Sequence, residues 1–147
     1  MQHDLILKGA RVIDPSQNHD GLCDVAFAEG RVSGFGRDLV AGPGTQVREM
    51  GGAIVTPGLI DLHTHVYWGG TSIGIDADDF CRTSGVTTSV DTGSAGPGNF
   101  SGFRKHVIDR SEARILAYLH VSFAGIYAFS KTIMVGETFP GTARRAR

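Results

Sequence analysis

The sequence predicts an α/β protein in which a small all-β unit precedes alternating strands and helices. Residues 1–57 contain short runs of alternating polar and apolar side chains separated by Gly-rich turns, a pattern typical of strands. After Pro57, apolar and β-branched runs alternate with stretches of helical pattern. This β-α-β-α-β order predicts a parallel sheet.

In the first unit, the predicted strands cover residues 4–13 (two short strands around Lys8-Gly9), 23–28, 31–35, 45–50 and 53–56. Glu29-Gly30 separates the strands 23–28 and 31–35 and predicts the tight turn of a β-hairpin. Asp14-Pro15-Ser16 and residues 41–44 are expected to be loops.

In the second unit, the predicted strands cover residues 59–62, 86–90 and 114–121, and the predicted helices cover residues 76–82 and a stretch from about Ser101. We expect Leu59, Ile60 and Leu62 to form a buried strand. Gly85 is placed to end the first helix. Phe103 and Val107 fall on the inner face of the second helix, with Ile108 as a further candidate.

Composition and charge limit the classes of partner. The 147 residues are 41% hydrophobic and 20% charged, which is typical of a globular chain. The formal net charge of −1 favours neither nucleic acid nor an anionic membrane as a partner. Cys23 and Cys81 stand far apart, as expected of reduced thiols in a cytoplasmic protein. No signal peptide or membrane-spanning segment is predicted, and a homo-oligomer stays open.

Two histidines, His63 and His65, follow the first strand of the second unit. In an extended strand, residues i and i+2 point to one face, so both imidazoles can converge on one cation while Thr64 faces the opposite side. In parallel α/β folds, chemistry takes place at the C-terminal ends of the strands. The alternatives are core histidines bonded to the backbone or simple surface residues.

The run Pro57-Gly58-Leu59-Ile60-Asp61-Leu62-His63-Thr64-His65 resembles the signature Pro-Gly-x-Ile-Asp-x-His-x-His of the amidohydrolase superfamily. Residues 85–96 resemble the second barrel strand and loop of that family, and the likeness extends from Asp4 to Lys131. Within the superfamily, the chain is most similar to the amidohydrolase/deacetylase group, relatives of dihydroorotase and D-aminoacylase.

This resemblance implies that residues 58–147 begin a (β/α)8 TIM-type barrel, and that residues 1–57 contribute to a small β-sandwich beside it. It also implies one or two divalent metal ions, often zinc, that activate water for hydrolysis of an amide or ester bond. The substrate would be a small N-acyl or ester compound, which favours a deacetylase-type enzyme. A dihydroorotase-like cyclic amidohydrolase and a non-catalytic fragment or binding module are the alternatives.

By the same resemblance, His63 and His65 match metal ligands. Asp61 matches the signature aspartate; it shares the alternation of the two histidines and is either a hydrogen-bond partner of a ligand or a structural acceptor. No residue aligns with the family's bridging carboxylated lysine, two later histidines or base aspartate. Lys131 is not assigned the bridging role, and no catalytic residue is assigned.

Other polar residues carry weaker signals. His106 is expected on a solvated helix face, His120 in the core or a pocket, and Cys81 in helix packing. Asp91 ends a strand and would either bond loop amides or line the pocket. Tyr67 and Trp68 would either line a substrate pocket or pack the loop. Residues 93–98 are Gly-rich but lack the Lys-Ser/Thr of a phosphate-binding P-loop.

The length does not suffice for a closed barrel. A (β/α)8 barrel needs roughly 250 residues, whereas about 90 residues follow Pro57, enough for three strands. Residues 135–147 are atypical, because the last seven contain three arginines and no large apolar side chain. We therefore expect a truncated barrel that is inactive by itself; the alternative is a natural basic tail on a small domain.

Overall fold

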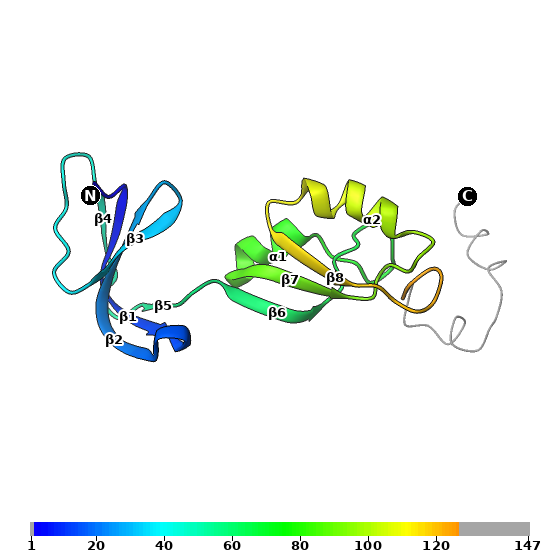
Figure 1. Cartoon of the computed structure of the whole chain (residues 1–147), viewed down its shortest axis with the longest axis horizontal. Coiled ribbons are helices and arrows are strands. Elements are labelled where there is room, and N and C mark those ends of the chain that lie inside the picture. The colour runs from blue at the N-terminus through cyan, green and yellow to red at the C-terminus, as the bar shows by residue number, and fades with distance from the viewer. Residues whose placement is uncertain (1, 127–147) are drawn as a thin grey trace. The chain divides into compact units, whose positions relative to one another are not determined.

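The computed structural model describes residues 2–126 (Figure 1). The expectations for Lys131 and for residues 135–147 lie outside this range. The chain divides into two compact units after Pro57. Within residues 2–126, no helix combines the length and the apolar character needed to cross a membrane.

The first unit is a five-stranded sheet, as the all-β prediction requires. Its strands are β1 (Leu5–Asp14), β2 (His19–Ala28), β3 (Arg31–Gly36), β4 (Gln46–Glu49) and β5 (Ile54–Val55). The strand order is β3-β2-β1-β4, and β5 also pairs with β1. The predicted hairpin is confirmed, because β2 and β3 pair antiparallel on either side of Glu29-Gly30. A core of Ala10, Val12, Cys23 and Val25 lies on this sheet.

One strand, β1, replaces the two short strands predicted around Lys8-Gly9. Its pairing with β2 shifts register between Leu7 and Ala10. Gly9 adopts a φ of 69°, and its amide donates to Asp24 Oδ1 at 2.8 Å. A β-bulge with glycine in the left-handed region admits an extra residue without ending the strand. The glycine therefore bends the strand, and the prediction of two strands was wrong.

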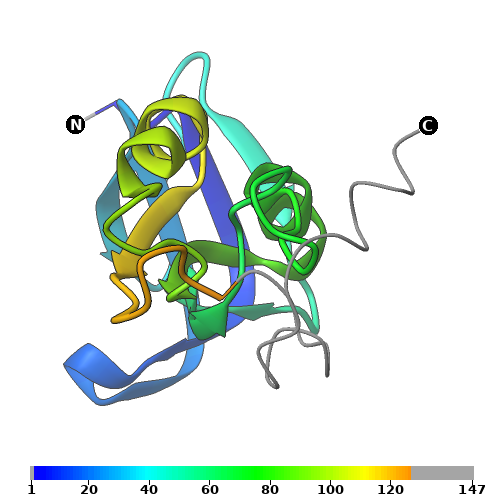
Figure 2. The same cartoon turned by 90° about the vertical axis from the view of Figure 1, so that its right-hand side faces the viewer.

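The second unit contains the predicted parallel sheet. Its strands are β6 (Leu59–Thr64), β7 (Val86–Thr92) and β8 (Arg114–Tyr118), in the order β6-β7-β8. The helices α1 (Ala77–Ser84) and α2 (Phe100–His106) lie on the same side of this sheet (Figures 1 and 2). The buried core between helices and sheet consists of Val66, Ala77, Ala95, Phe103 and Ile115.

Local capping explains the bounds of α1. The Asp76 side chain accepts hydrogen bonds from the amides of Asp78 and Asp79, so it satisfies two donors that a helix N-terminus leaves unpaired. Gly85 ends the helix with a φ of 74°, a left-handed conformation that favours glycine. The predicted helix is thus confirmed and extends to Ser84.

The expectation that Leu59, Ile60 and Leu62 are buried was wrong. Their exposed fractions are 50%, 60% and 71%. The reason is that β6 is an edge strand, and within residues 2–126 nothing pairs with its outer side. The other edge strand, β8, also exposes large apolar side chains and ends at Tyr118 instead of the predicted Val121.

Among residues 2–126, Phe103 is the largest fully buried side chain, and it should contribute strongly to stability. We expect Phe103→Ala to lower the free energy of unfolding by about 3–5 kcal/mol, because a buried ring is replaced by a cavity. Leu62→Ala is the control: its side chain is exposed, so we expect a change within about 0.5 kcal/mol. Urea denaturation monitored by circular dichroism measures both, and equal losses would contradict this account of the core.

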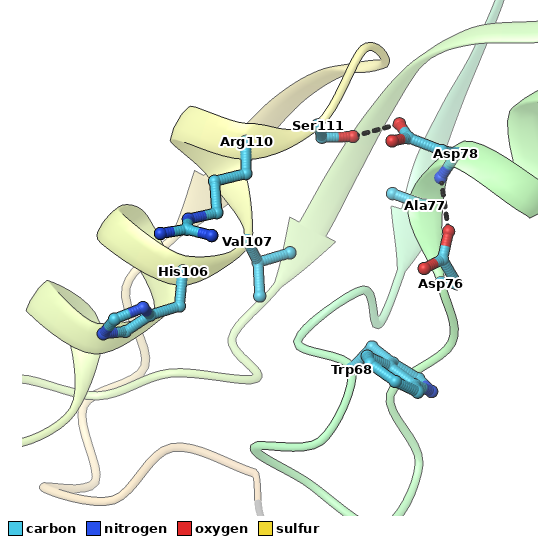
Figure 3. Close-up of a pocket in the computed structure, with 8 residues that line it drawn as sticks. All are labelled: Trp68, Asp76, Ala77, Asp78, His106, Val107, Arg110 and Ser111. Carbon is cyan, nitrogen blue, oxygen red and sulfur yellow. Dashed lines mark hydrogen bonds between the residues drawn. The ribbon is translucent and has the colours of Figure 1, made fainter.

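Asp78 joins the start of α1 to the segment before β8. Its carboxylate accepts a hydrogen bond from the Ser111 hydroxyl (Figure 3). It also accepts the Ala113 amide at 2.9 Å and the Glu112 amide at 3.2 Å. The Ser111 hydroxyl is the main cause that lowers the pKa of Asp78, followed by the Ala113 amide. The ionised form is therefore favoured in the folded protein.

This lowered pKa predicts a pH dependence of stability. The stabilisation by Asp78 should be complete above its unfolded-state pKa of about 3.9 and should be lost as the pH falls through the lower folded-state pKa. Denaturation at a series of pH values should show a loss that is smaller in Asp78→Asn, which has no charge to titrate. Identical pH profiles for the two proteins would show that Asp78 has no such role.

Candidate metal site

The paired histidines lie where the first parallel strand ends. β6 ends at Thr64, and His65 follows it directly. The imidazole rings of His63 and His65 have centroids 5.6 Å apart and planes inclined at 75°. Thr64 is buried, and its hydroxyl donates to the Val90 carbonyl at 3.1 Å, whereas His63 is exposed. The two imidazole rings therefore lie close together, whereas the Thr64 side chain is buried and hydrogen-bonds to β7.

His65 is the more firmly held of the two rings. Its Nδ1 lies 3.0 Å from the hydroxyl oxygen of Ser94, which is fully buried. Burial lowers the pKa of His65; the Asp91 carboxylate acts in the opposite direction, and the neighbouring His63 lowers the pKa further. The net effect favours the neutral imidazole, which is the form that binds metals.

Asp91 links the loop after β6 to the loop after β7. The residue is completely buried. Its Oδ2 accepts the Val66 amide at 2.8 Å, and its Oδ1 accepts the amides of Gly93 and Ser94 at 3.1 and 2.7 Å. Of the two expectations for Asp91, the bonding of loop amides is confirmed. The same carboxylate thus fixes the residue after His65 and the serine that contacts His65.

A third segment supports the loop after β7. The His120 amide donates to the Ala95 carbonyl at 3.0 Å, and the Ile126 amide donates to the Gly93 carbonyl at 2.9 Å. A Cβ at Gly96 would collide with the Ser122 carbonyl oxygen, so glycine is required at this close approach. Residues 93–96 therefore lie between the start of the loop after β6 and the chain after β8.

Asp61 acts as a structural acceptor. Its Oδ1 accepts the backbone amide of His63 at 2.9 Å. The pairing of β6 with β7 shifts register between Asp61 and Thr64, so the simple alternation through residues 61, 63 and 65 is interrupted. The structure thus favours one of the two roles that the sequence left open.

The remaining candidates lie elsewhere. His106 is exposed on α2, as predicted. The Nδ1 of His120 accepts the Ser122 amide at 2.9 Å, which makes it a loop-stabilising residue that follows β8. Cys81 on α1 lies with its Sγ 3.7 Å from the hydroxyl oxygen of Ser89. Among the described residues, none of these three side chains joins the histidine pair in a group of three possible metal ligands.

The two aromatic residues after the histidines differ in role. Tyr67 stacks on Phe103, with ring centroids 4.6 Å apart, and so packs the loop. Trp68 is 63% exposed and borders a surface pocket of about 240 Å³. In this pocket it lies opposite His106 and Arg110 (Figure 3). Neither His63 nor His65 lines the pocket, so it is separate from the candidate metal site.

The donor set fits a metal ion only in part. Two neighbouring imidazoles suit zinc, but a catalytic zinc takes three protein ligands. Within residues 2–126, no group of three or more His, Cys, Asp or Glu side chains could hold a metal ion. The described residues thus offer two of the three protein ligands that a catalytic zinc takes.

Sequence reasoning missed Ser94. The Gly-rich stretch 93–98 lacks the signature of a phosphate-binding loop, and up to residue 96 it resembles the loop after the second barrel strand, but neither observation assigns a role to Ser94. A small polar residue between glycines, directly after a parallel strand, was the available signal. Its contact with His65 spans 29 positions along the chain, and no local pattern indicates it.

No family model matches the chain. A deacetylase of Agrobacterium fabrum is 41% identical over 103 residues, which cover 70% of this chain and 25% of the relative. The chain thus spans about a quarter of the length of this curated relative.

Two solved structures extend the likeness. A dihydroorotase matches with a TM-score of 0.72 and 33% identity over 86% of this chain and 33% of that protein. The N-acyl-D-glutamate deacylase of Bordetella bronchiseptica, complexed with zinc and a phosphonate inhibitor, matches with a TM-score of 0.58 and 20% identity over 81% and 30% of the two chains. The last likeness concerns the fold alone. Together with the histidine signature, these findings show that the chain belongs to the amidohydrolase superfamily.

Proposed function

We propose that the chain is part of a metal-dependent amidohydrolase of the deacetylase type, in which His63 and His65 bind a divalent metal ion, most often zinc. The observation that carries this proposal is the pair of imidazoles, 5.6 Å apart, at the C-terminal end of the first parallel strand. The 41% identity to a deacetylase supports the reaction class. The substrate would be a small N-acyl or ester compound.

The chain's own residues have distinct parts in this proposal. His63 and His65 supply neutral nitrogen ligands, and the lowered pKa of His65 favours that form. When bound, a metal of this kind lowers the pKa of a water molecule and polarises the scissile carbonyl. The sheet β6-β7-β8 would be the first part of a (β/α)8 barrel, and its exposed outer strands support this assignment.

A dihydroorotase-like cyclic amidohydrolase is the second candidate. The structural match to a dihydroorotase, with a TM-score of 0.72, favours it. Both candidates share the histidine pair, so the ligands do not separate them. Parallel assays of an intact protein containing this chain, with N-acetyl amino acids and with dihydroorotate, would do so.

Both cysteines, Cys23 and Cys81, are free thiols. This supports a reducing compartment, and we propose the cytoplasm.

The proposed ligand role predicts that zinc binding depends on both histidines. Isothermal titration of the 147-residue chain with Zn²⁺ should show weak binding to one site, because the described residues offer two ligands there. His63→Ala and His65→Ala should each abolish it. His106→Ala is the matched control, since this exposed helix histidine lies outside the pair. Unchanged binding in either of the first two variants would overturn the metal role.

We also predict that the 147-residue chain alone does not hydrolyse these substrates. Two ligands leave a catalytic zinc incompletely held. Product release from N-acetyl amino acids and from dihydroorotate, measured with added Zn²⁺, should equal the buffer background. A zinc-dependent rate that disappears in His63→Ala would show the chain to be active by itself.

A further inference from the structure

We infer that Ser94 is a positioning residue that orients the His65 imidazole for metal binding, an inference that rests on the proposed function. The hydroxyl oxygen of Ser94 lies 3.0 Å from Nδ1 of His65. With Nδ1 engaged in this way, Nε2 is the nitrogen through which His65 would bind a metal. Metal-binding histidines commonly use the second ring nitrogen for such a contact, which fixes the tautomer and the ring plane.

The position of Ser94 is itself fixed. Its side chain is fully buried, and its amide donates to Asp91 Oδ1 at 2.7 Å. The other oxygen of Asp91 accepts the amide of Val66, the residue after His65. The Asp91 carboxylate therefore accepts hydrogen bonds from the backbone of Ser94 and from the backbone next to His65. Because neither of these backbone segments can shift independently, the hydroxyl sets the direction of the ring.

The partner ring depends on this arrangement. Among the described contacts, the ring of His63 meets that of His65 edge to face, with centroids 5.6 Å apart. His63 is exposed, and its backbone amide donates to Asp61. A change in the orientation of the His65 ring would therefore also change the distance between the two imidazoles.

A hydroxyl suits this role for a chemical reason. It can donate to an imidazole nitrogen or accept from an imidazole N–H. The contact can therefore form with either tautomer of neutral His65. One of them carries its proton on Nδ1, and this is the tautomer that metal binding through Nε2 requires. In addition, a serine adds no negative charge beside the buried Asp91.

The first test reads the ring directly in the metal-free chain. Long-range ¹H–¹⁵N NMR of the 147-residue chain reports the tautomer and the Nδ1 shift of His65. Ser94→Ala should change both, because the hydrogen bond is lost. Ser89→Ala is the matched control: Ser89 is equally buried on β7 but lies against Cys81, so the His65 signals should stay unchanged. Unaltered His65 signals in Ser94→Ala would overturn the inference.

The second test measures Zn²⁺ affinity by calorimetry. Ser94→Ala should bind Zn²⁺ about 10-fold or more weakly than the original chain, Ser94→Cys should lie between the two, and Ser89→Ala should bind equally. Equal affinity in Ser94→Ala would overturn the inference. If the original chain binds no zinc while Ser94→Ala still alters the ring signals, the proposed metal role fails and the Ser94–His65 contact stands.

Discussion

The buried carboxylate of Asp91 is the interaction on which the geometry around both histidines depends. A carboxylate that is completely removed from water is costly unless its oxygens accept hydrogen bonds. Three backbone amides meet this requirement, one from the loop after β6 and two from the loop after β7. The need to satisfy one charge thus forces two loops, from two neighbouring strands, into a single arrangement.

A second constraint concerns the edges of this sheet, because neither edge strand has an outer neighbour among the described residues. A closed barrel gives every strand two partners, whereas β6 and β8 each have one among the described residues. Their outer positions carry large exposed apolar side chains, which a sheet edge in contact with water does not favour. Such side chains are typical of strands that have a partner on both sides, and the chain spans about a third of the matched dihydroorotase.

Local patterns made most elements of the two units predictable. Asp76 and Gly85 cap α1 through contacts within a few residues, so the sequence alone indicates where this helix begins and ends. The parallel order of strands follows equally from the alternation after Pro57. In contrast, the exposure of Leu62 depends on what pairs with the edge of β6, and no property of residues 59–62 determines that.

The site was predictable to the same limited extent. The spacing of His63 and His65 predicts two neighbouring rings, and the structure has them together although His65 lies just beyond the end of β6. The sequence leaves two roles open for Asp61, and its bond to the His63 amide, next to a register shift that alternation does not predict, favours the structural one. The Ser94–His65 contact joins two strands through their following loops, and only the folded sheet reveals it.

The two imidazoles are not equally prepared for a ligand. His65 is anchored through Ser94 to loops that Asp91 and the chain after β8 support, whereas His63 is an exposed ring in contact with His65. Ordering a mobile side chain costs free energy on binding, and a ring that is already oriented avoids that cost. In the proposed metal site, the exposed ring of His63 should therefore lose more conformational entropy on binding than the anchored ring of His65. For this reason, a contact that fixed the orientation of His63 would raise the affinity of the proposed site.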